Sequence, residues 1–288
     1  MRWVEITVGA AVESADAVTE IMIGEGCGGT AVSGSSVSLS VVGYLPVDDR
    51  LEARLDAIKT KVRQLPEFGL PITSDEIGIK WVEDDEWADA WKKYFKPVRF
   101  GRVVVKPSWE EYEEQPGDVI VEIDPGMAFG TGNHPTTALC LFALQDCIKG
   151  GETVLDMGTG SGILAIAAAR LGAARVAAYD IDPVAVEVAS KNVGLCGLES
   201  VITVGEAASP LAYEGMADLV LANIIPNVIL AMAENLCAKV RPGGKLITSG
   251  IILERADEVK ARLESHGLAT AEQREDGDWV AIISERRG

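Results

Sequence analysis

A glycine-rich turn at residues 156–162, which reads D-M-G-T-G-S-G, could hold a ligand. Apolar residues at 153–155 predict a short strand before the turn, and residues 163–170 predict a helix after it. Glycine lets a ligand come close to the backbone at the start of a helix, because no Cβ stands in the way. We therefore expect Gly158 and Gly160 to contact a cofactor, beside the acid Asp156 at the end of the strand.

A second acid, Asp180, ends the next predicted strand and lies 22 residues beyond Gly158. In doubly wound sheets an acid at this place accepts hydrogen bonds from a ribose diol. NAD and S-adenosylmethionine both carry such a ribose, so Asp180 indicates a nucleoside without saying which one. Asp182 stands directly before Pro183 and is expected to cap the following helix instead.

The spacing of the turn separates these two cofactors. A dinucleotide site reads G-x-G-x-x-G, whereas this turn reads D-x-G-x-G-x-G. Asp156 would repel a pyrophosphate, but it suits a ligand that carries an ammonium and a sulfonium group. The turn therefore favours S-adenosylmethionine over NAD.

Asn223 follows an apolar predicted strand at residues 217–222. An Asn side chain offers both a hydrogen-bond donor and an acceptor. We expect Asn223 to contact the amino-acid end of the cofactor or to orient a substrate amine; the alternative is that it caps the next helix.

An unusual loop precedes the glycine-rich turn, at residues 124–137. Its glycines would let it lie over a bound ligand, with Phe129 against an adenine face. The alternative is a plain turn with a helix cap at Thr136 or Thr137. His134 suits a structural hydrogen bond at least as well as catalysis.

Strands and helices must position these residues. From residue 153 onward strands and helices alternate, which predicts an α/β fold with a doubly wound, Rossmann-like sheet. Its expected strands are at residues 153–155, 175–179, 201–204, 217–222, 245–249 and 279–283. Shorter strands are expected near residues 100–106 and 119–123.

The first 85 residues have a different pattern, β-α-β-β-α-β, which is typical of a smaller α+β ferredoxin-like domain. One of its helices carries an apolar stripe of Leu51, Leu55, Ile58, Val62 and Leu65. We therefore predict domains at residues 1–85 and 86–288. A short aromatic helix that ends at Pro97 is expected to begin the second domain.

Composition limits the possible functions. The 288 residues carry a net charge of −18, which argues against a nucleic-acid surface. It permits a basic partner, or simply keeps the protein soluble. The five cysteines are scattered and only two histidines are present, so no metal site is expected. Without a predicted membrane span or signal peptide, the chain is expected to be cytoplasmic.

Five blocks together resemble the ribosomal protein L11 methyltransferases. The loop A-F-G-T-G-N-H-P-T-T is followed by V-L-D-M-G-T-G-S-G-I-L, D-I-D-P, A-N-I and S-G-I, in the order and spacing of that family. The match covers roughly residues 87–255. The N-terminal pattern is similar in kind to that family's substrate-recognition domain.

The resemblance implies a transferase that moves methyl groups from S-adenosylmethionine to lysine ε-amines and the N-terminal amine of ribosomal protein L11. It places cofactor contacts on Thr137, Gly158, Asp180 and Asn223. Pro226 departs from the family pattern, in which a small or aliphatic residue is usual. The alternatives are a methyltransferase for another protein, an RNA or a small molecule, and a non-catalytic S-adenosylmethionine-binding adaptor on the ribosome.

Overall fold

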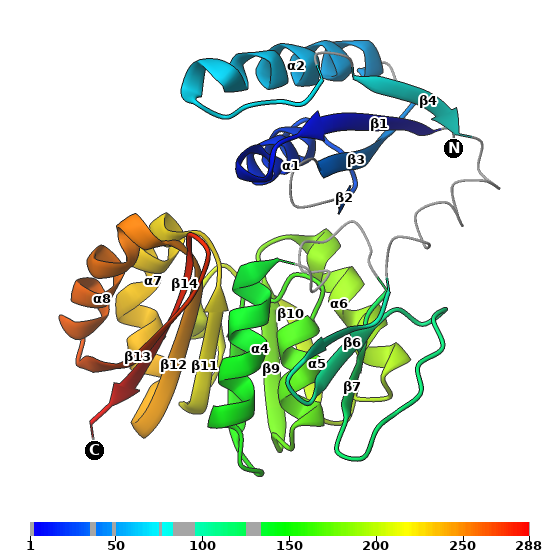
Figure 1. The fold of residues 1–288 in the computed structure, drawn as a ribbon. Coiled ribbons are helices and arrows are strands. Elements are labelled where there is room, and N and C mark those ends of the chain that lie inside the picture. The colour runs from blue at the N-terminus through cyan, green and yellow to red at the C-terminus, as the bar shows by residue number, and fades with distance from the viewer. Residues whose placement is uncertain are drawn as a thin grey trace. The chain divides into compact units, whose positions relative to one another are not determined.

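The computed structural model describes residues 3–34, 39–47, 50–74, 77–82, 96–124 and 134–287. The chain forms two compact units, Met1–Lys96 and Pro97–Gly288 (Figure 1). The predicted boundary between residues 85 and 86 and the predicted aromatic helix before Pro97 lie outside the described residues. Both stay predictions.

In the described residues of the first unit, a four-stranded antiparallel sheet is accompanied by two α-helices. Its sheet has the order β2-β3-β1-β4, so β3 lies between β1 and β2, which are joined through a helix. This is the split β-α-β arrangement of a ferredoxin-like fold, as the sequence predicts. The elements are β1 (Trp3–Ala10), α1 (Ala15–Gly24), β2 (Thr30–Gly34), β3 (Leu39–Pro46), α2 (Leu51–Gln64) and β4 (Gly78–Val82).

Alternation along the strands explains the core of this unit. In β1 every second residue is buried, and these residues pack with the apolar faces of α1 and α2. The predicted stripe on α2 is confirmed, because Leu51, Ile58, Val62 and Leu65 are buried and Leu55 packs beside them.

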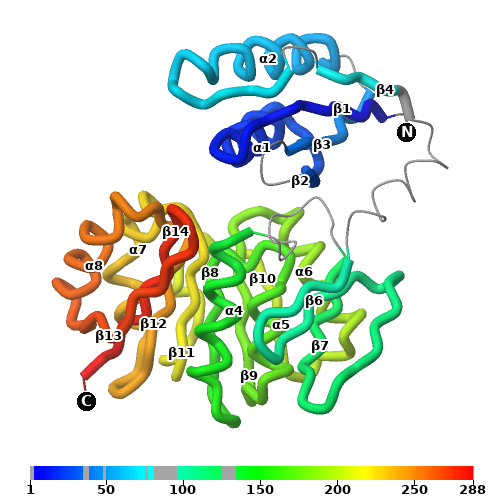
Figure 2. Tube along the Cα trace, viewed as in Figure 1, coloured from blue at the N-terminus to red at the C-terminus, as the bar shows by residue number. Residues whose placement is uncertain are grey.

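The second unit is built on a seven-stranded sheet of order β10-β9-β8-β11-β12-β14-β13 (Figure 2). The first five strands in this order are parallel, which confirms the doubly wound arrangement; β14 runs antiparallel to both of its neighbours, β12 and β13. The strands are β8 (Thr153–Met157), β9 (Arg175–Asp180), β10 (Ile202–Glu206), β11 (Ala217–Asn223), β12 (Val240–Ile252), β13 (Leu268–Asp276) and β14 (Trp279–Arg286). The helices are α4 (Pro135–Cys147), α5 (Ile163–Arg170), α6 (Pro183–Leu195), α7 (Pro226–Lys239) and α8 (Ala256–Glu264).

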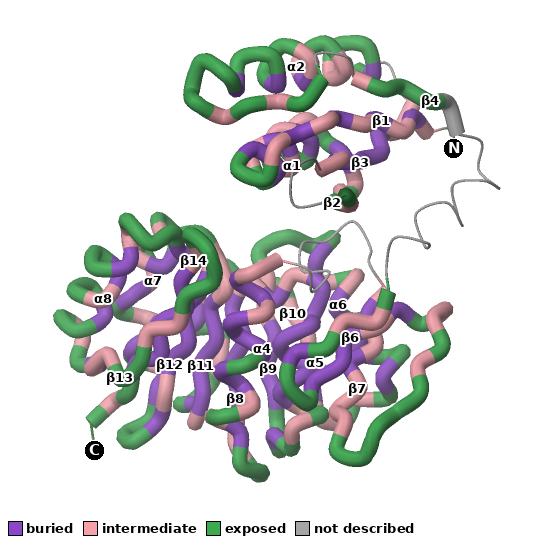
Figure 3. The backbone as a smooth tube through the Cα atoms, in the orientation of Figure 1, coloured by how far each residue is buried: buried purple, intermediate pink, exposed green. Residues whose placement is uncertain are grey.

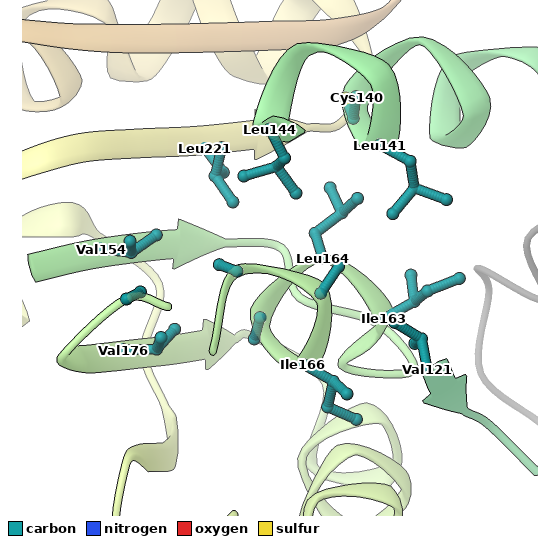
Figure 4. Close-up of a cluster of buried hydrophobic side chains, with 14 of the residues drawn as sticks. Val121, Cys140, Leu141, Leu144, Val154, Ile163, Leu164, Ile166, Val176 and Leu221 are labelled. Atoms are coloured by element: carbon teal, nitrogen blue, oxygen red, sulfur yellow. The ribbon is translucent and has the colours of Figure 1, made fainter. Parts of the chain in front are cut away.

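Strand β11 (Ala217–Asn223) is apolar from Leu219 to Ala222, because both of its faces are covered there. Leu219 and Leu221 belong to the core cluster that contains α4 and α5 residues, and Figure 4 shows Leu221 beside Leu144 of α4. Val220 and Ala222 belong to the second cluster, with α7 and α8. The central strands are accordingly buried (Figure 3).

Strand β13 was not expected from the sequence, which predicts no strand between residues 249 and 279. It is an edge strand with an irregular register between Thr270 and Glu272. Its polar residues hide the alternation that identifies a strand, and such residues are common on sheet edges. A small additional sheet, β5-β6-β7, holds β5 (Val98–Phe100), β6 (Val103–Lys106) and β7 (Val119–Glu122).

No helix within the described ranges is long and apolar enough to cross a membrane. All five cysteines are free thiols, four of them buried.

Candidate functional site

The candidate site lies where the strand order of the sheet reverses. From β8 the chain builds outward through β9 and β10, and β11 and β12 then occupy the opposite side of β8. In open α/β sheets a crevice forms at the carboxyl ends of the strands at such a point. Asp156, Asp180 and Asn223 all lie at the carboxyl ends of these neighbouring strands, and Asp156 is paired in register with Leu221.

The glycine-rich turn is fastened to β9 through its own amides. Gly158 N and Thr159 N donate to Tyr179 O at 2.8 and 3.0 Å, and Gly160 N donates to Asp180 Oδ2 at 2.9 Å. These three amides are therefore not free to donate to a ligand. Contact between the turn and a ligand stays a prediction.

Gly158 is required by its surroundings as well as by its backbone. Its φ of 74° lies in the left-handed region, and a Cβ there would stand 2.3 Å from Ile224 Cγ2. Gly250, with φ of 81°, lies on the other side, where a Cβ would stand 2.5 Å from Ile224 O. Two glycines from different strand ends thus let the segment after Asn223 pack closely at the centre of the site.

Asp156 is the most perturbed acid of the site. It is 1% exposed, and Thr159 Oγ1 donates to its Oδ2 at 2.7 Å. Its Oδ1 has no hydrogen-bond partner among the described residues. Burial raises the pKa of Asp156 to about 7; the Thr159 bond and the backbone N–H of Ala165 oppose this shift, and the nearby Asp180 charge adds to it.

A buried carboxylate with an unused oxygen suits a cationic group, which would stabilise its charged form. This arrangement fits the ammonium of S-adenosylmethionine. Thr159 was not singled out from the sequence; the only available signal was its place between two glycines of the turn.

Asp180 and Asp182 have the separate surroundings that the sequence suggests. Asp182 Oδ1 accepts from Val184 N at 2.9 Å, which confirms it as the N-cap of α6. The Asp180 carboxylate accepts from Gly160 N and, at 3.0 Å, from Asp182 N. It is half-buried, and these two bonds fix its position at the edge where a ribose would lie. Its contact with a ribose stays a prediction.

Asn223 meets Thr137, which lies 86 residues earlier in the chain. Asn223 Nδ2 lies 3.5 Å from Thr137 Oγ1, and Thr137 is fully buried in the first turn of α4. The alternative role of Asn223 as a helix cap is wrong, because Ile225 is the N-cap residue of α7 and Pro226 is its first residue. Because Asn223 donates toward Thr137 through Nδ2, its Oδ1 can accept a hydrogen bond from another group.

His134 has a structural role at the start of α4. Its Nδ1 accepts from Thr136 N at 3.3 Å and lies 2.7 Å from Thr136 Oγ1, so His134 is the N-cap rather than Thr136 or Thr137. Its ring packs edge-on against Trp279, with ring centroids 4.8 Å apart. Ser249 Oγ donates toward Thr136 O at 3.3 Å, so β12 and β14 both hold this turn. Phe129 lies outside the described residues.

The described site therefore has two parts. The first part is the pair of acids, Asp156 and Asp180, with the turn between them; it suits a nucleoside that carries a positive charge. The second part is the side-chain amide of Asn223, which lies beside Thr137 at the adjacent strand end. These groups suit a transfer reaction in which orientation is the main contribution of the protein.

Comparison with known proteins gives one family over nearly the whole chain. Residues 2–287 match the family described as "Ribosomal protein L11 methyltransferase". Curated relatives of that name include one from Pelotomaculum thermopropionicum, 43% identical over 99% of both chains, and one from Alkaliphilus oremlandii, 37% identical over the full length of both. The crystal structure of the ribosomal protein L11 methylase from Lactobacillus delbrueckii subsp. bulgaricus aligns with a TM-score of 0.61 and 31% identity, over 67% of this chain and all of that one.

Proposed function

This chain belongs to the ribosomal protein L11 methyltransferase family, and on that basis we propose that it transfers methyl groups from S-adenosylmethionine to amines of ribosomal protein L11. In this proposal the acceptors are lysine ε-amines and the N-terminal amine. In this proposal the reaction takes place in the cytoplasm, where ribosomal proteins are found.

The residues that would hold the cofactor come from three strand ends. Asp156 would face its ammonium group, and Asp180 would accept hydrogen bonds from its ribose. Gly158 and Gly160 would contact it, Thr137 would line the site, and Phe129 would cover the adenine. The unused Oδ1 of Asp156 supports this arrangement, because burial disfavours the charged carboxylate and a neighbouring cation would stabilise it.

When bound, S-adenosylmethionine supplies a methyl group on a positively charged sulfur. The acceptor amine attacks with its lone pair, so a nitrogen–carbon bond forms as the carbon–sulfur bond breaks and its electron pair stays on sulfur. The amine must first lose a proton to solvent, which for an ordinary lysine at pH 7 costs about 4 to 5 kcal/mol. Asn223 Oδ1 would accept a hydrogen bond from the neutral amine and hold its lone pair in line.

The observation that carries this proposal is the contact between Asn223 and Thr137. It directs the side-chain nitrogen of Asn223 toward Thr137, at the strand end next to Asp156. An acceptor held at this place can orient a neutral amine beside a cationic cofactor without a dedicated base. Positioning of this kind accounts for large rate effects in group transfer.

The acidic first 85 residues support a basic protein as the substrate. They carry 7 Lys and Arg against 15 Asp and Glu, a net charge of −8. In this proposal they form the substrate-recognition domain, and residues 86–288 form the catalytic domain.

The direct test is to incubate the protein with methyl-labelled S-adenosylmethionine and purified L11, and to locate the label by mass spectrometry. We expect label on lysines and on the N-terminus of L11. Label on another component of a total ribosomal protein mixture, with none on L11, would contradict the proposal. Binding of the cofactor without any transfer would favour the adaptor alternative.

A further inference from the structure

Exposed apolar side chains gather beside Asn223, in the segments that follow β11 and β12. Ile225 is 62% exposed and Val228 follows it in the first turn of α7, while Leu253 is 44% exposed and Ile252 precedes it at the end of β12. We call these four residues the α7–β12 patch. Apolar side chains left in water in such numbers at one place commonly mark an interaction site.

The two halves of this patch are held together. Arg255 Nη1 donates to Asn227 Oδ1 at 2.6 Å, which joins the segment after β12 to the first turn of α7. Strands β11 and β12 are paired in register up to Asn223 and Ser249; β11 ends there, and β12 continues beside β14 to Ile252. The segment after β12 and the first turn of α7 are therefore held next to each other.

The cofactor does not account for the patch. The groups expected to bind its ribose and ammonium, Asp180 and Asp156, are on β9 and β8. The patch lies on the opposite side of Asn223 from them, because β11 and β12 follow β8 in the sheet order. Exposed Ile181, in contrast, directly follows Asp180 and belongs to the cofactor side.

The charges around the α7–β12 patch indicate what kind of partner surface would bind it. Four exposed acids, Glu254, Asp257, Glu258 and Asp278, lie in its own segments or next to them. Arg255 pairs with Glu258 and Lys260 with Asp257, which leaves an excess of negative charge. Leu253 N donates to Asp278 O at 2.8 Å, so Asp278 lies at the border of the patch. An apolar centre with an acidic border complements an apolar patch bordered by Lys and Arg.

We propose that the α7–β12 patch is the docking surface on the catalytic unit for the folded body of a basic substrate protein. This inference rests on the proposed function. A protein amine that reaches Asn223 brings the surface around that amine over the neighbouring strand ends. The patch would select amines that stand beside an apolar surface, and its contribution would resist salt because burial of apolar area does not depend on ionic strength.

The test uses the full chain with the double variant Val228→Ser/Leu253→Ser. These two residues are preferred to Ile225, because Ile225 is the N-cap residue of α7 and its replacement would alter the start of that helix. We expect the KM for intact L11 to rise about tenfold, as for truncation of central interface residues, and the rise to persist at high salt. The Kd for S-adenosylmethionine and the turnover of a short lysine peptide should stay unchanged. The matched control is Leu195→Ser/Leu211→Ser, which removes two exposed leucines outside the patch.

Three results would overturn the inference. The first is an unchanged KM for L11 in the patch variant. The second is a parallel loss with L11 and the short peptide, which would assign the patch to the chemical site. The third is a change in the separation of the two units in small-angle scattering with L11 binding unchanged, which would assign it to the chain's own first unit. Failure of the wild-type protein to methylate L11 would instead overturn the proposed function, and this inference with it.

Discussion

At the scale of single residues, Asp156 is the acid whose surroundings matter most. Its side chain is buried, and the nearby charge of Asp180 raises its pKa further. Its Oδ1 accepts no hydrogen bond from a described residue. Such a carboxyl stays partly protonated near neutral pH until a cation joins it. Cofactor affinity and protein stability should therefore both depend on its ionisation.

We expect the affinity for S-adenosylmethionine to fall with pH below about 7, by up to about tenfold per pH unit, because the pKa of Asp156 is raised to about 7 and a cation binds its charged form. Isothermal titration calorimetry between pH 5.5 and 8 measures this. Asp156→Asn should bind weakly at every pH, whereas Asp257→Asn, at a fully exposed acid, should behave as wild type. An affinity that does not change with pH in the wild type would contradict the expectation.

Without cofactor, Asp156→Asn should stabilise the protein at pH 7. The folded pKa of about 7 exceeds the unfolded value near 3.9, so folding holds a proton that the unfolded chain releases. Stability is therefore lost as pH rises from about 4 to about 7, by up to about 4 kcal/mol. Denaturant unfolding at pH 4 and pH 7 measures the difference between variant and wild type. It should be small at pH 4 and large at pH 7; equal differences would show that ionisation is not the cause.

Asn223→Ala should lower kcat for methylation of L11 at least about 100-fold, because the amine loses the acceptor that orients it. Cofactor affinity should change less, since Asp156 and Asp180 remain. Steady-state kinetics with labelled cofactor measure the first effect and calorimetry the second. Asn235→Ala, on α7 away from the strand ends, is the control; near-normal turnover of Asn223→Ala would exclude the orienting role.

At the scale of elements, the site depends on a close approach between the turn after β8 and the segment after β11. Gly158 lies against Ile224, and Gly250 allows the same segment to approach β12. The Ser249 hydroxyl and the His134–Trp279 contact hold the first turn of α4 beside them. The site is thus assembled from elements that are far apart in sequence.

Gly158→Ala should destabilise the protein by about 2 to 4 kcal/mol and abolish cofactor binding, because the added Cβ would overlap Ile224 and the backbone has a positive φ. Gly197→Ala is the matched control: φ is 64° there, but nothing lies within 4 Å of the added Cβ. It should cost only about 1 kcal/mol. Thermal unfolding compares the two, and similar losses would show that the contact with Ile224 is unimportant.

At the scale of the whole molecule, the net charge of −18 is the dominant property. Long-range attraction of a basic protein would speed its capture, and salt would screen it over distances beyond about 8 Å. The α7–β12 patch would act only at contact.

We expect the KM for L11 to rise several-fold between 50 and 500 mM salt, as is usual for electrostatic steering. The Kd for the cofactor should change little, because its site is partly buried. Steady-state kinetics over a salt series measure the first quantity and calorimetry the second. A KM that is independent of salt would count against a role for the acidic surface in substrate capture.

The sequence alone determines a large part of this protein. Alternation in β1, the stripe on α2 and the apolar run of β11 predict both folds, because local periodicity reports which faces are buried. Each of the three polar residues Asp156, Asp180 and Asn223 follows a predicted strand. Because the carboxyl ends of parallel strands lie at the same edge of a sheet, this was sufficient to place them at one edge. Strand β13 was missed because a polar edge strand has no such periodicity.

Only the tertiary structure decided which of these residues touch. Three contacts join residues that are 20 to 86 positions apart. They are the bond of Gly160 to Asp180, the contact of Asn223 with Thr137, and the close approach of Ile224 to Gly158. The same holds for the unused oxygen of Asp156 and for the link that joins the α7–β12 patch. Residue types and spacing report the pattern along one element, whereas these contacts depend on how separate elements pack, which no local pattern encodes.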